Sequence, residues 1–582
     1  MRIAVLDKEK CKAGIDCPYI CMNACPVNRT HKECISKTDE KIAIDESLCI
    51  GCNICVKKCP FNAISIINLP AQLKEDPLHK YDENGFRIFG LPTPRFGKVV
   101  GILGKNGMGK STALKILSGM LIPNFGSDNE DKEKVISYFK GNEAMNYFRN
   151  LYDDKIKVVY KVQDISGIAT AYKGKTVKEL LEHVDEKQMF DYVVEELDLR
   201  NLLDSDVSKI SGGELQRLAI AATFIKKADV YFIDEPSSYL DIKQRLKVAR
   251  FIQSLVNDKV AVMVVEHDLI MLDFMSDLVY LMYGEPAKYG ITSLLKSTKQ
   301  GMNEYVHGFL RDENMRIRDK PLVFDKLSFN KKPHTETLLE FKPLKKEFEH
   351  FTLTTDHGKI HKKHVVGIIG ENGIGKTTFV KLLAKAEHAD EGEIELFSDR
   401  EDISYKPQYL CIEEDISVLQ FLEHALKYTE LIKPLQLDKL YDKRLKNLSG
   451  GELQKVMIVH ALAKEAAIYL LDEPSAYLDV EQRLIIARAI RDFIDINGKT
   501  VMVVDHDLLF IDYLSDDIIV FDGVPAKAGY ANAPLDMSKG MNSFLKRLNI
   551  TMRRDHESNR PRINKQDSVK DKEQKSKDLY YE

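Results

Sequence analysis

Short apolar runs divide the chain into segments of strand length. Residues 99–103 and 365–369 are runs of Val, Ile, Leu and Gly, and each leads through a glycine-rich string into a segment with Leu and Ile at helical spacing. Residues 230–233 and 468–471 form two further apolar runs, and residues 261–265 form another. Short apolar strands that alternate with helices are typical of a parallel sheet covered by helices. The pattern therefore predicts an α/β fold.

None of these runs is long enough to cross a membrane. A membrane-spanning helix needs about 18 apolar residues, whereas the longest runs here, such as 261–265, have the length of a strand. Residues 1–7 also lack an apolar core of the size found in signal peptides. We therefore expect a soluble, cytoplasmic protein that makes no contact with a membrane.

Composition sets only broad limits. With 44% hydrophobic residues, the 582-residue chain can form ordinary buried cores, and at about 150 residues per domain it predicts about four domains. Its 85 Lys and Arg nearly balance its 89 Asp and Glu, which gives a formal charge of −4. Any contact with nucleic acid must then come from local basic patches and not from the overall charge.

One set of strings occurs twice along the chain, in the same order. A single match could arise by chance, but a repeated order could not, so we predict two tandem nucleotide-binding domains. The strings are G-x-x-x-x-G-K-[ST] at 104–111 and 370–377, Ser-Gly-Gly-Glu-Leu-Gln at 211–216 and 449–454, and Asp-Glu-Pro-Ser at 234–237 and 472–475.

The first copy is longer than the second between its first two strings, and residues 128–154 are the best candidate for the excess. This charged segment carries apolar residues in two groups around Gly141 and Asn142, which predicts two short helices. Such an insertion is either a neutral surface excursion or an element that binds a partner.

The glycine-rich strings have the chemistry of phosphate-binding loops. Backbone N–H groups at the start of a helix point toward a phosphate, and the helix dipole adds to their field. Lys110 and Lys376 are positioned to reach the β- and γ-phosphates, and Ser111 and Thr377 to place a hydroxyl on Mg²⁺.

Acidic residues follow two of the predicted strands. Asp234 and Asp472 stand at the carboxyl ends of these strands, where each can hold Mg²⁺ or its water. Glu235 and Glu473 come next and are placed to polarise an attacking water as general bases.

The order of these strings, with a Gln before the Ser-Gly-Gly string and a His after the acidic pair, resembles that of ATP-binding-cassette (ABC) ATPases. The resemblance implies that the Ser-Gly-Gly string of one cassette closes over the ATP held by the other. Two ATP molecules would then join the halves of a single monomer, and hydrolysis would release them.

The resemblance assigns three sets of site residues, and Phe86 and Phe351 are candidates for stacking on adenine. The catalytic set is Glu235, Glu473, His267, His506, Gln163 and Gln408. The nucleotide-binding set is Gly104, Asn106, Gly107, Gly109, Lys110, Ser111, Thr112, Ser211, Gly212, Gly213, Glu214 and Asp241, with Gly370, Asn372, Gly373, Gly375, Lys376, Thr377, Thr378, Ser449, Gly450, Gly451, Glu452 and Asp479. Mg²⁺ would be held by Ser111, Gln163 and Asp234 in the first site and by Thr377, Gln408 and Asp472 in the second.

Nine of the ten cysteines lie between Cys11 and Cys59. The spacing Cys49-x2-Cys52-x2-Cys55-x3-Cys59-Pro is that of bacterial ferredoxins, in which the fourth Cys ligates the other of two clusters. The simplest assignment is an α+β, ferredoxin-like domain with two [4Fe–4S] clusters, which leaves Cys34 over and Cys411 as a core residue. One cluster would be held by Cys25, Cys49, Cys52 and Cys55, and the other by Cys11, Cys17, Cys21 and Cys59. A zinc site is the alternative, although zinc explains the Cys-Pro pairs poorly.

The cysteine-rich segment, the twin cassettes and a paired Gly-Met-Asn at 301–303 and 540–542 together resemble the E family of ABC proteins, the ribosome-recycling ATPases once called RNase L inhibitors. The resemblance implies that ATP-driven closure splits ribosomes, with the iron–sulfur domain as a mechanical lever. It implies binding to the small ribosomal subunit and its rRNA, partly through the inserted helices, and to a release-factor-like protein. The protein would stay with the small subunit toward initiation, where initiation factors are further candidate partners. A transport ATPase and an ATP-coupled electron-transfer protein are the alternatives.

Basic residues gather near the end of the chain and form either a phosphate-contacting patch or a solvated basic helix. They are Lys546, Arg547, Arg553 and Arg554.

The predicted domains follow from these assignments. The predicted map is an iron–sulfur domain at 1–70, a first nucleotide-binding domain at 71–300, a hinge at 301–345, a second nucleotide-binding domain at 346–545, and a basic hinge end with a disordered charged tail at 546–582.

Overall fold

The structure is a computed structural model that describes residues 2–8, 10–38, 41–68, 76–82, 84–126, 131–324, 336–398, 403–408 and 415–582. Cys411, the boundary at residues 70 and 71, the start of the insertion at 128–130 and part of the expected hinge at 325–335 lie outside the described residues.

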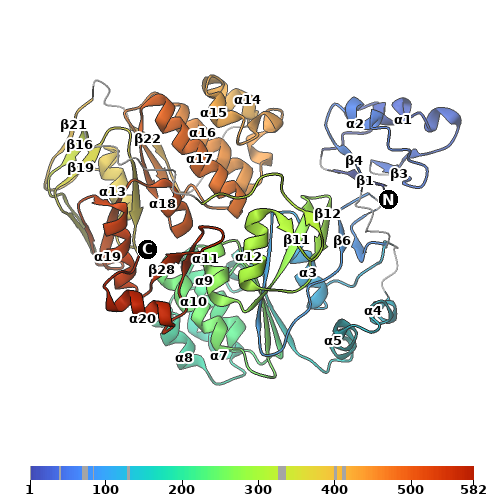
Figure 1. The fold of residues 1–582 in the computed structure, drawn as a ribbon, viewed down its shortest axis with the longest axis horizontal. Helices are drawn as coiled ribbons and strands as arrows, with labels where there is room; N and C mark the ends of the chain where they lie inside the picture. The colour runs from blue at the N-terminus through green and yellow to red at the C-terminus, as the bar shows by residue number, and fades with distance from the viewer. Residues whose placement is uncertain are drawn as a thin grey trace.

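Residues 2–68 form a small α+β unit, the cysteine module, which stands beside the rest of the molecule in Figure 1. Its first and last strands pair antiparallel, which closes the unit. The elements are β1 (Arg2–Leu6), α1 (Ile20–Ala24), β2 (Ile35–Lys37), β3 (Ile42–Ile44), α2 (Ile54–Lys58) and β4 (Ile64–Asn68). The module rests on the next segment of the chain, because Asn84 exchanges hydrogen bonds with Ile44 and Ala4, and Arg87 forms an ion pair with Glu46.

Cassette one is built on a nine-stranded sheet whose order is β5-β6-β12-β11-β7-β10-β9-β8, with β13 paired to β11. Strands β7 to β10 are apolar and fully buried except at β8, as the runs in the sequence predict. Its strands are β5 (His79–Lys80), β6 (Arg87–Phe89), β7 (Val99–Gly104), β8 (Val158–Lys161), β9 (Val230–Asp234), β10 (Ala261–Val265), β11 (Leu278–Glu285), β12 (Tyr289–Thr292) and β13 (Lys296–Ser297). Its helices are α3 (Lys110–Leu117), α4 (Lys132–Tyr138), α5 (Glu143–Tyr152), α6 (Ser166–Ala171), α7 (Val177–Val184), α8 (Phe190–Glu196), α9 (Gly212–Phe224), α10 (Ile242–Ser254), α11 (Leu269–Met275) and α12 (Thr298–His307).

The nine-stranded sheet of cassette two repeats this topology strand for strand, with the order β17-β18-β26-β25-β20-β24-β23-β22 and β27 paired to β25. Its strands are β16 (Thr337–Phe341), β17 (Lys345–Phe348), β18 (Phe351–Thr355), β19 (Gly358–His361), β20 (Val365–Ile369), β21 (Ile394–Leu396), β22 (Ile403–Lys406), β23 (Ile468–Asp472), β24 (Thr500–Val504), β25 (Asp517–Val524), β26 (Ala528–Ala531) and β27 (Leu535–Asp536). Its helices are α13 (Lys376–Leu383), α14 (Val418–Phe421), α15 (Thr429–Ile432), α16 (Gly450–Ala463), α17 (Val480–Asn497), α18 (Leu508–Leu514) and α19 (Met537–Arg547). The predicted α/β fold of twin cassettes with an α+β iron–sulfur unit is confirmed.

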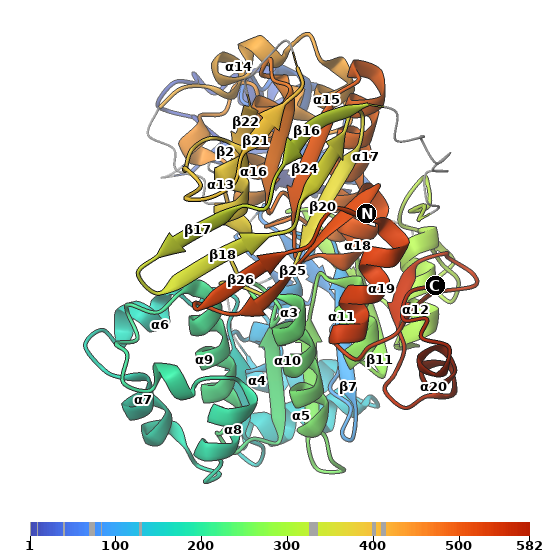
Figure 2. The ribbon, with the colours of Figure 1, turned by 90° about the vertical axis from the view of Figure 1, so that its left-hand side faces the viewer.

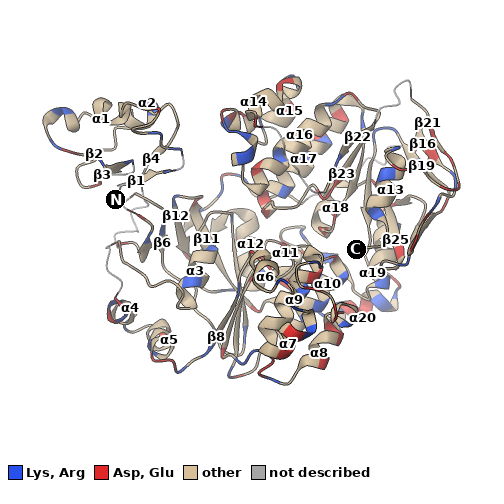
Figure 3. Ribbon diagram, turned by 180° about the vertical axis from the view of Figure 1, so that it is seen from behind, with Lys and Arg blue, Asp and Glu red and all other residues tan. Residues whose placement is uncertain are grey.

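The two cassettes face each other and share buried apolar side chains. Figure 2 shows cassette two above cassette one, with the C-terminal segment, residues 546–582, along the side of both. One cluster of buried apolar residues includes Val99 of cassette one, Val365 of cassette two and Ile563 of the C-terminal segment. Basic and acidic residues are interspersed over both cassettes (Figure 3), in keeping with the small net charge. In the described parts of the chain, no helix combines the length and apolarity needed to cross a membrane.

The second cassette begins before the predicted boundary at 346. Strand β16 (Thr337–Phe341) already pairs with β19 and β21 in a three-stranded sheet of this cassette. After α12, the last helix of cassette one, the described part of the connector therefore consists of the hairpin of β14 (Phe309–Leu310) and β15 (Met315–Arg316) and the residues up to 324.

The predicted pair of short helices in the insertion is present as α4 and α5. The side chains of Asp131 and Asn142 cap their N-termini. On α5, Phe148 is fully buried, and the Tyr147 hydroxyl donates a 2.6 Å hydrogen bond to the carbonyl of Leu117 at the end of α3. The pair is thus fixed to cassette one by one face.

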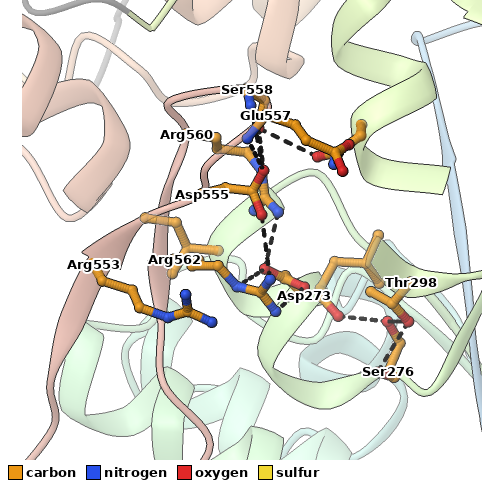
Figure 4. Close-up of polar contacts among 12 residues, drawn as sticks. Asp273, Ser276, Thr298, Arg553, Asp555, Glu557, Ser558, Arg560 and Arg562 are labelled. Carbon is orange, nitrogen blue, oxygen red and sulfur yellow. Dashed lines mark hydrogen bonds and ion pairs between the residues drawn. The ribbon is translucent and has the colours of Figure 1, made fainter. Parts of the chain in front are cut away.

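The prediction of a disordered charged tail within residues 546–582, after a basic hinge end, is wrong. These residues, here called the C-terminal segment, contain β28 (Met552–Arg554), β29 (Pro561–Ile563) and α20 (Val569–Ser576). Figure 4 shows the reason: charges of this segment are paired with one another and with Asp273, and several of them are buried. Arg560 is 0% exposed and forms a 2.9 Å ion pair with Asp273 on α11, which Arg562 also contacts.

The four basic residues expected to form a patch all have partners within the chain. Lys546 pairs with Asp578, Arg547 with Asp522 and Arg554 with Asp512, while Arg553 donates a hydrogen bond to Asn564. These contacts belong to neither expected alternative, the phosphate-contacting patch or the solvated basic helix. They stabilise the fold of the C-terminal segment and its attachment to cassette two.

Candidate nucleotide-binding and cluster sites

Each phosphate loop wraps around the ammonium group of its own lysine. Lys110 Nζ donates 2.8 Å hydrogen bonds to the carbonyls of Gly104 and Lys105, and Lys376 Nζ donates to those of Gly370 and Glu371. Burial lowers the pKa of both lysines to about 8. A loop that already curls around a buried cation is shaped to accept the negative oxygens of a phosphate.

Glycines allow the loops to adopt this shape and let an aromatic ring lie against them. Gly109 and Gly375 have φ of 85° and 92°, in the left-handed region that favours glycine. A Cβ atom at Gly109 would lie 2.7 Å from the ring of Phe86, and one at Gly375 would lie 2.8 Å from the ring of Phe351. The two candidate adenine-stacking rings therefore lie directly beside the phosphate loops.

The residues expected to hold Mg²⁺ meet at the end of the central strands. In cassette two, Thr377 Oγ1 donates a 3.1 Å hydrogen bond to Asp472 Oδ2. In cassette one, Asp234 is 1% exposed, and its Oδ1 atom has no hydrogen-bond partner among the described residues. Burial raises the pKa of both aspartates. A buried carboxylate oxygen without a donor, next to a hydroxyl, fits an oxygen-coordinated divalent cation.

The glutamates that follow are held by the predicted Gln and His side chains. Gln163 Nε2 donates a 2.7 Å hydrogen bond to Glu235 Oε1, and His267 Nε2 lies 3.3 Å from the same oxygen. Glu473 repeats this with Gln408 at 2.7 Å and His506 at 3.5 Å. The side chains that the sequence assigned to catalysis thus lie together in each cassette, although they are far apart along the chain.

The two clusters differ in electrostatics. Burial works to raise the pKa of Glu235, but hydrogen bonding and charge attraction from His267, with the Gln163 bond, hold it at about 2. Burial and Asp472 together raise the pKa of Glu473, and burial with Lys376 and Arg245 lowers that of His506 well below its usual value. Because its pKa is held at about 2, Glu235 is fully ionised at neutral pH.

Each phosphate loop contacts the opposite cassette through an aspartate. Asn372 N donates a 2.8 Å hydrogen bond to Asp241 Oδ2, and Asn106 N donates at 3.4 Å to Asp479 Oδ2. Ion pairs of Lys105 with Glu481 at 2.8 Å and of Lys243 with Glu371 at 2.9 Å flank these contacts.

The Ser-Gly-Gly strings lie next to the same interface. A Cβ atom on Gly213 would come within 2.9 Å of the Tyr239 carbonyl oxygen, and that oxygen lies 3.5 Å from Asn372 Nδ2 of the opposite loop. Gly451 stands in the same relation to the Tyr477 carbonyl, at 3.0 Å. Only glycine leaves room at these points, and the helix N-terminus that follows is brought toward the other cassette's phosphate loop.

Two expected nucleotide contacts have another role in the structure. Glu214 and Glu452 accept hydrogen bonds from the side chains and backbone of Ser211 and Ser449 and so complete capping boxes at the starts of α9 and α16. Thr112 and Thr378 lie in the first turns of α3 and α13.

Sequence reasoning missed four buried side chains behind the glutamates. Lys161 and Lys406 donate to the carbonyls of Asp234 and Asp472, and Gln216 and Gln454 donate to those of Glu235 and Glu473. A signal was present: Tyr-Lys-x-Gln occurs at 160–163 and 405–408, and both glutamines end the repeated Ser-Gly-Gly-Glu-Leu-Gln string.

The cysteine module contains two cavities, and each is lined by the set of cysteines expected for one cluster. Cys11, Cys17, Cys21 and Cys59 line the first; Cys25, Cys49, Cys52 and Cys55 line the second, together with Cys34. Burial raises the pKa of Cys21 and Cys55 to about 11, so these thiols need a metal to become thiolates near neutral pH. Four thiols converging in an apolar cavity fit a [4Fe–4S] cluster.

Comparison with known proteins places these features in one family. The family described as ABC transporter matches residues 93–238 and 353–476, and that described as 4Fe-4S binding domain matches residues 42–65. The chain is 43% identical to ABC transporter E family member 1 of Arabidopsis thaliana and 45% identical to translation initiation factor RLI1 of Saccharomyces cerevisiae, covering 100% of this chain and 98% of each relative. A solved structure described as a model of ribosome-bound archaeal Pelota and ABCE1 matches 100% of this chain and 99% of its own, with a TM-score of 0.92 and 51% identity. The chain therefore belongs to the E family of ABC proteins.

Proposed function

We propose that this protein is an ATPase that splits ribosomes into subunits by closing its two cassettes around two ATP molecules. The observation that carries the proposal is the similarity over the full chain to the archaeal protein in a ribosome-bound complex. The relatives named as translation factors support the same conclusion.

Each ATP site would be composite. Lys110 and the backbone N–H groups around it would hold the β- and γ-phosphates, and Ser449, Gly450 and Gly451 of the other cassette would approach the γ-phosphate from the opposite side. The hydrogen bonds from Asn372 to Asp241 and from Asn106 to Asp479 support this arrangement, because they already join each phosphate loop to the opposite cassette. ATP would thus strengthen an interface that exists within one chain, which makes the functional unit a monomer.

Hydrolysis would depend on the glutamate in each site. Glu235 and Glu473 would accept a proton from the attacking water. The side chains that contact these carboxylates, His267 and Gln163 in one site and His506 and Gln408 in the other, would orient them. Ser111, Gln163 and Asp234 in one site, and Thr377, Gln408 and Asp472 in the other, would hold Mg²⁺, which would neutralise charge on the phosphates.

The cysteine module would hold two [4Fe–4S] clusters, with Cys11, Cys17, Cys21 and Cys59 as one set of ligands and Cys25, Cys49, Cys52 and Cys55 as the other. The module contacts cassette one through Asn84 and the Arg87–Glu46 pair. Movement of that cassette would therefore be transmitted to the module, which would act as a lever. The expected partners are the small ribosomal subunit with its rRNA, a release-factor-like protein and initiation factors.

Co-sedimentation tests the proposed function. With a non-hydrolysable ATP analogue, the protein should sediment with small ribosomal subunits, and with ATP and a release-factor-like protein it should convert whole ribosomes into subunits. Failure to bind the small subunit in the ATP-analogue state would reject the proposal. ATP hydrolysis that is stimulated only by a membrane protein would favour a transport ATPase, and splitting that requires the clusters to change oxidation state would favour coupled electron transfer.

A further inference from the structure

A buried lysine ends one strand in each cassette. Lys161 is the last residue of β8 and is 4% exposed, and Lys406 is the last residue of β22 and is 1% exposed. An ammonium group is costly to bury without partners, so its presence at the same point in both cassettes requires an explanation.

Both lysines contact the backbone that carries the catalytic glutamate. Lys161 Nζ donates to the carbonyl of Asp234 at 2.9 Å and lies 3.5 Å from that of Glu235. Lys406 Nζ makes the same contacts with Asp472 at 2.7 Å and Glu473 at 3.5 Å. Hydrogen bonds from a charged donor are stronger than those between neutral groups.

The backbone at these glutamates is strained. Glu235 and Glu473 have φ of 46° and 45°, a left-handed conformation that is unfavourable for residues other than glycine. Such a conformation persists only where surrounding contacts fix it. Gln216 holds the following peptide groups through the carbonyls of Glu235 at 2.8 Å and Pro236 at 3.0 Å. The lysine holds the peptide group on the other side of the glutamate.

The lysine also links this turn to the glutamine that contacts the carboxylate. Gln163 lies two residues after Lys161, and its amide donates to Glu235 Oε1 at 2.7 Å. Gln408 lies two residues after Lys406 and contacts Glu473 in the same way. The end of one strand therefore fixes both the backbone and the side chain of each glutamate.

We propose that Lys161 and Lys406 are positioning residues for ATP hydrolysis, which clamp the strained turns that carry Glu235 and Glu473 and so fix each carboxylate relative to its Gln and His partners. The proposal rests on the proposed role of these glutamates as general bases. The lysines contact backbone carbonyls and not the expected place of ATP. Their loss should therefore slow the chemical step and leave nucleotide affinity almost unchanged.

The test uses Lys161→Met and Lys406→Met, singly and together, in the full-length protein. Methionine fills a similar volume without a charge or a donor. We expect the kcat of the double variant to fall about tenfold or more, with a change in the KM for ATP of less than about twofold. Lys157→Met, on an exposed side chain just before β8, is the matched control and should behave like the wild type.

A second comparison separates positioning from a general loss of stability. If each lysine acts through its glutamate, adding both Lys→Met changes to the Glu235→Gln/Glu473→Gln variant should cause no further loss in single-turnover rate. If the Lys→Met proteins do not fold, as judged by thermal unfolding, Lys161→Gln and Lys406→Gln replace them in both comparisons. Glutamine keeps the site polar, but it is uncharged and too short to repeat the contacts of the lysine with both carbonyls.

Three results would count against the inference. A wild-type kcat in a folded double lysine variant, a rise in KM that accounts for the whole effect, or losses that multiply with those of the glutamate variants would each overturn it. The general-base assignment fails only if the Glu→Gln variants themselves hydrolyse ATP at the wild-type rate. That result distinguishes failure of the proposed function from failure of the lysine inference alone.

Discussion

The backbone N–H of Asn372, in the phosphate loop of cassette two, donates a 2.8 Å hydrogen bond to the Oδ2 atom of Asp241 in cassette one. The other oxygen of the same carboxylate caps α10 by accepting a 2.9 Å hydrogen bond from Gln244 N. The side chain of Asp241 therefore both caps the start of its own helix and joins the two halves of the chain. Asp479 makes the same two contacts, with Gln482 and with Asn106.

We predict that Asp241→Asn and Asp479→Asn will uncouple the cassettes without weakening either one. Asparagine caps helices as well as aspartate does, but its NH₂ group cannot accept the bond from Asn372 or Asn106. Loss of a charge-assisted hydrogen bond of about 1.5 kcal/mol should reduce ATP-driven closure and ATPase activity about tenfold.

The measurement is steady-state ATPase activity together with the thermal unfolding midpoint. Asp241→Ala is the contrasting variant, because it also removes the cap, which is worth about 1 kcal/mol, and should lower the unfolding midpoint as well. An Asn variant with full activity would show that the contact does not contribute to closure.

The cysteine sets predict a crossed effect on the two clusters. Cys59 ends the spacing that begins at Cys49, but it lines the cavity of Cys11, Cys17 and Cys21. Cys59→Ser should therefore disturb the cluster held by Cys11, Cys17 and Cys21. Cys25→Ser should disturb the cluster held by Cys49, Cys52 and Cys55. We expect about eight irons per wild-type chain, and each variant should lose up to about half of them.

Iron and sulfide quantitation on anaerobically purified protein, with electron paramagnetic resonance to identify the affected cluster, checks this. Cys34→Ser is the control, because Cys34 is the fifth cysteine at the second cavity and has no place in the proposed ligand sets. A normal iron content in Cys59→Ser, or about four irons in the wild type, would contradict two cubanes with these ligands.

The sequence was sufficient for the parts of the site that recur as contiguous strings. The phosphate loops, the acidic pairs and the ferredoxin spacing each place their chemistry within about ten residues, so local rules predict the geometry. The likeness of the two copies also predicted the two sheets, whose strand orders correspond one to one.

What the sequence did not predict depends on contacts between distant residues. Lys161 meets the Asp234 carbonyl 73 residues later, and no rule for a single segment places a lysine behind a catalytic turn. Because the C-terminal segment is rich in charge, its sequence predicts disorder. Its charges are neutralised by partners such as Asp273, which lies 287 residues before Arg560.

The buried pair of Arg560 and Asp273 predicts that Arg560→Met will release the C-terminal segment. Removal of Arg560 leaves the buried Asp273 with Arg562 as its remaining ion-pair partner, so the cost should lie near or below about 3 kcal/mol, the lower end of the range for breaking a buried pair. Amide hydrogen exchange within residues 552–581 should therefore become much faster. Lys570→Met, which breaks the exposed pair of Lys570 with Glu573, should cost less than about 1 kcal/mol. Equal protection in both variants would show that the buried pair does not anchor the segment.

The last prediction concerns the helices α4 and α5. Tyr147 and Phe148 fix them to cassette one, whereas Lys140 and Arg149 of the same insertion are exposed and available to a polyanion. If these helices contact rRNA, Lys140→Glu combined with Arg149→Glu should weaken co-sedimentation with the small subunit. It should also reduce the dependence of binding on log salt concentration by about one unit for each lost phosphate contact.

ATPase activity without ribosomes should not change, because the insertion lies outside the residues assigned to either ATP site. Lys173→Glu, an exposed change elsewhere on cassette one, is the matched control. An unchanged salt dependence in the double variant would identify the insertion as a neutral surface element.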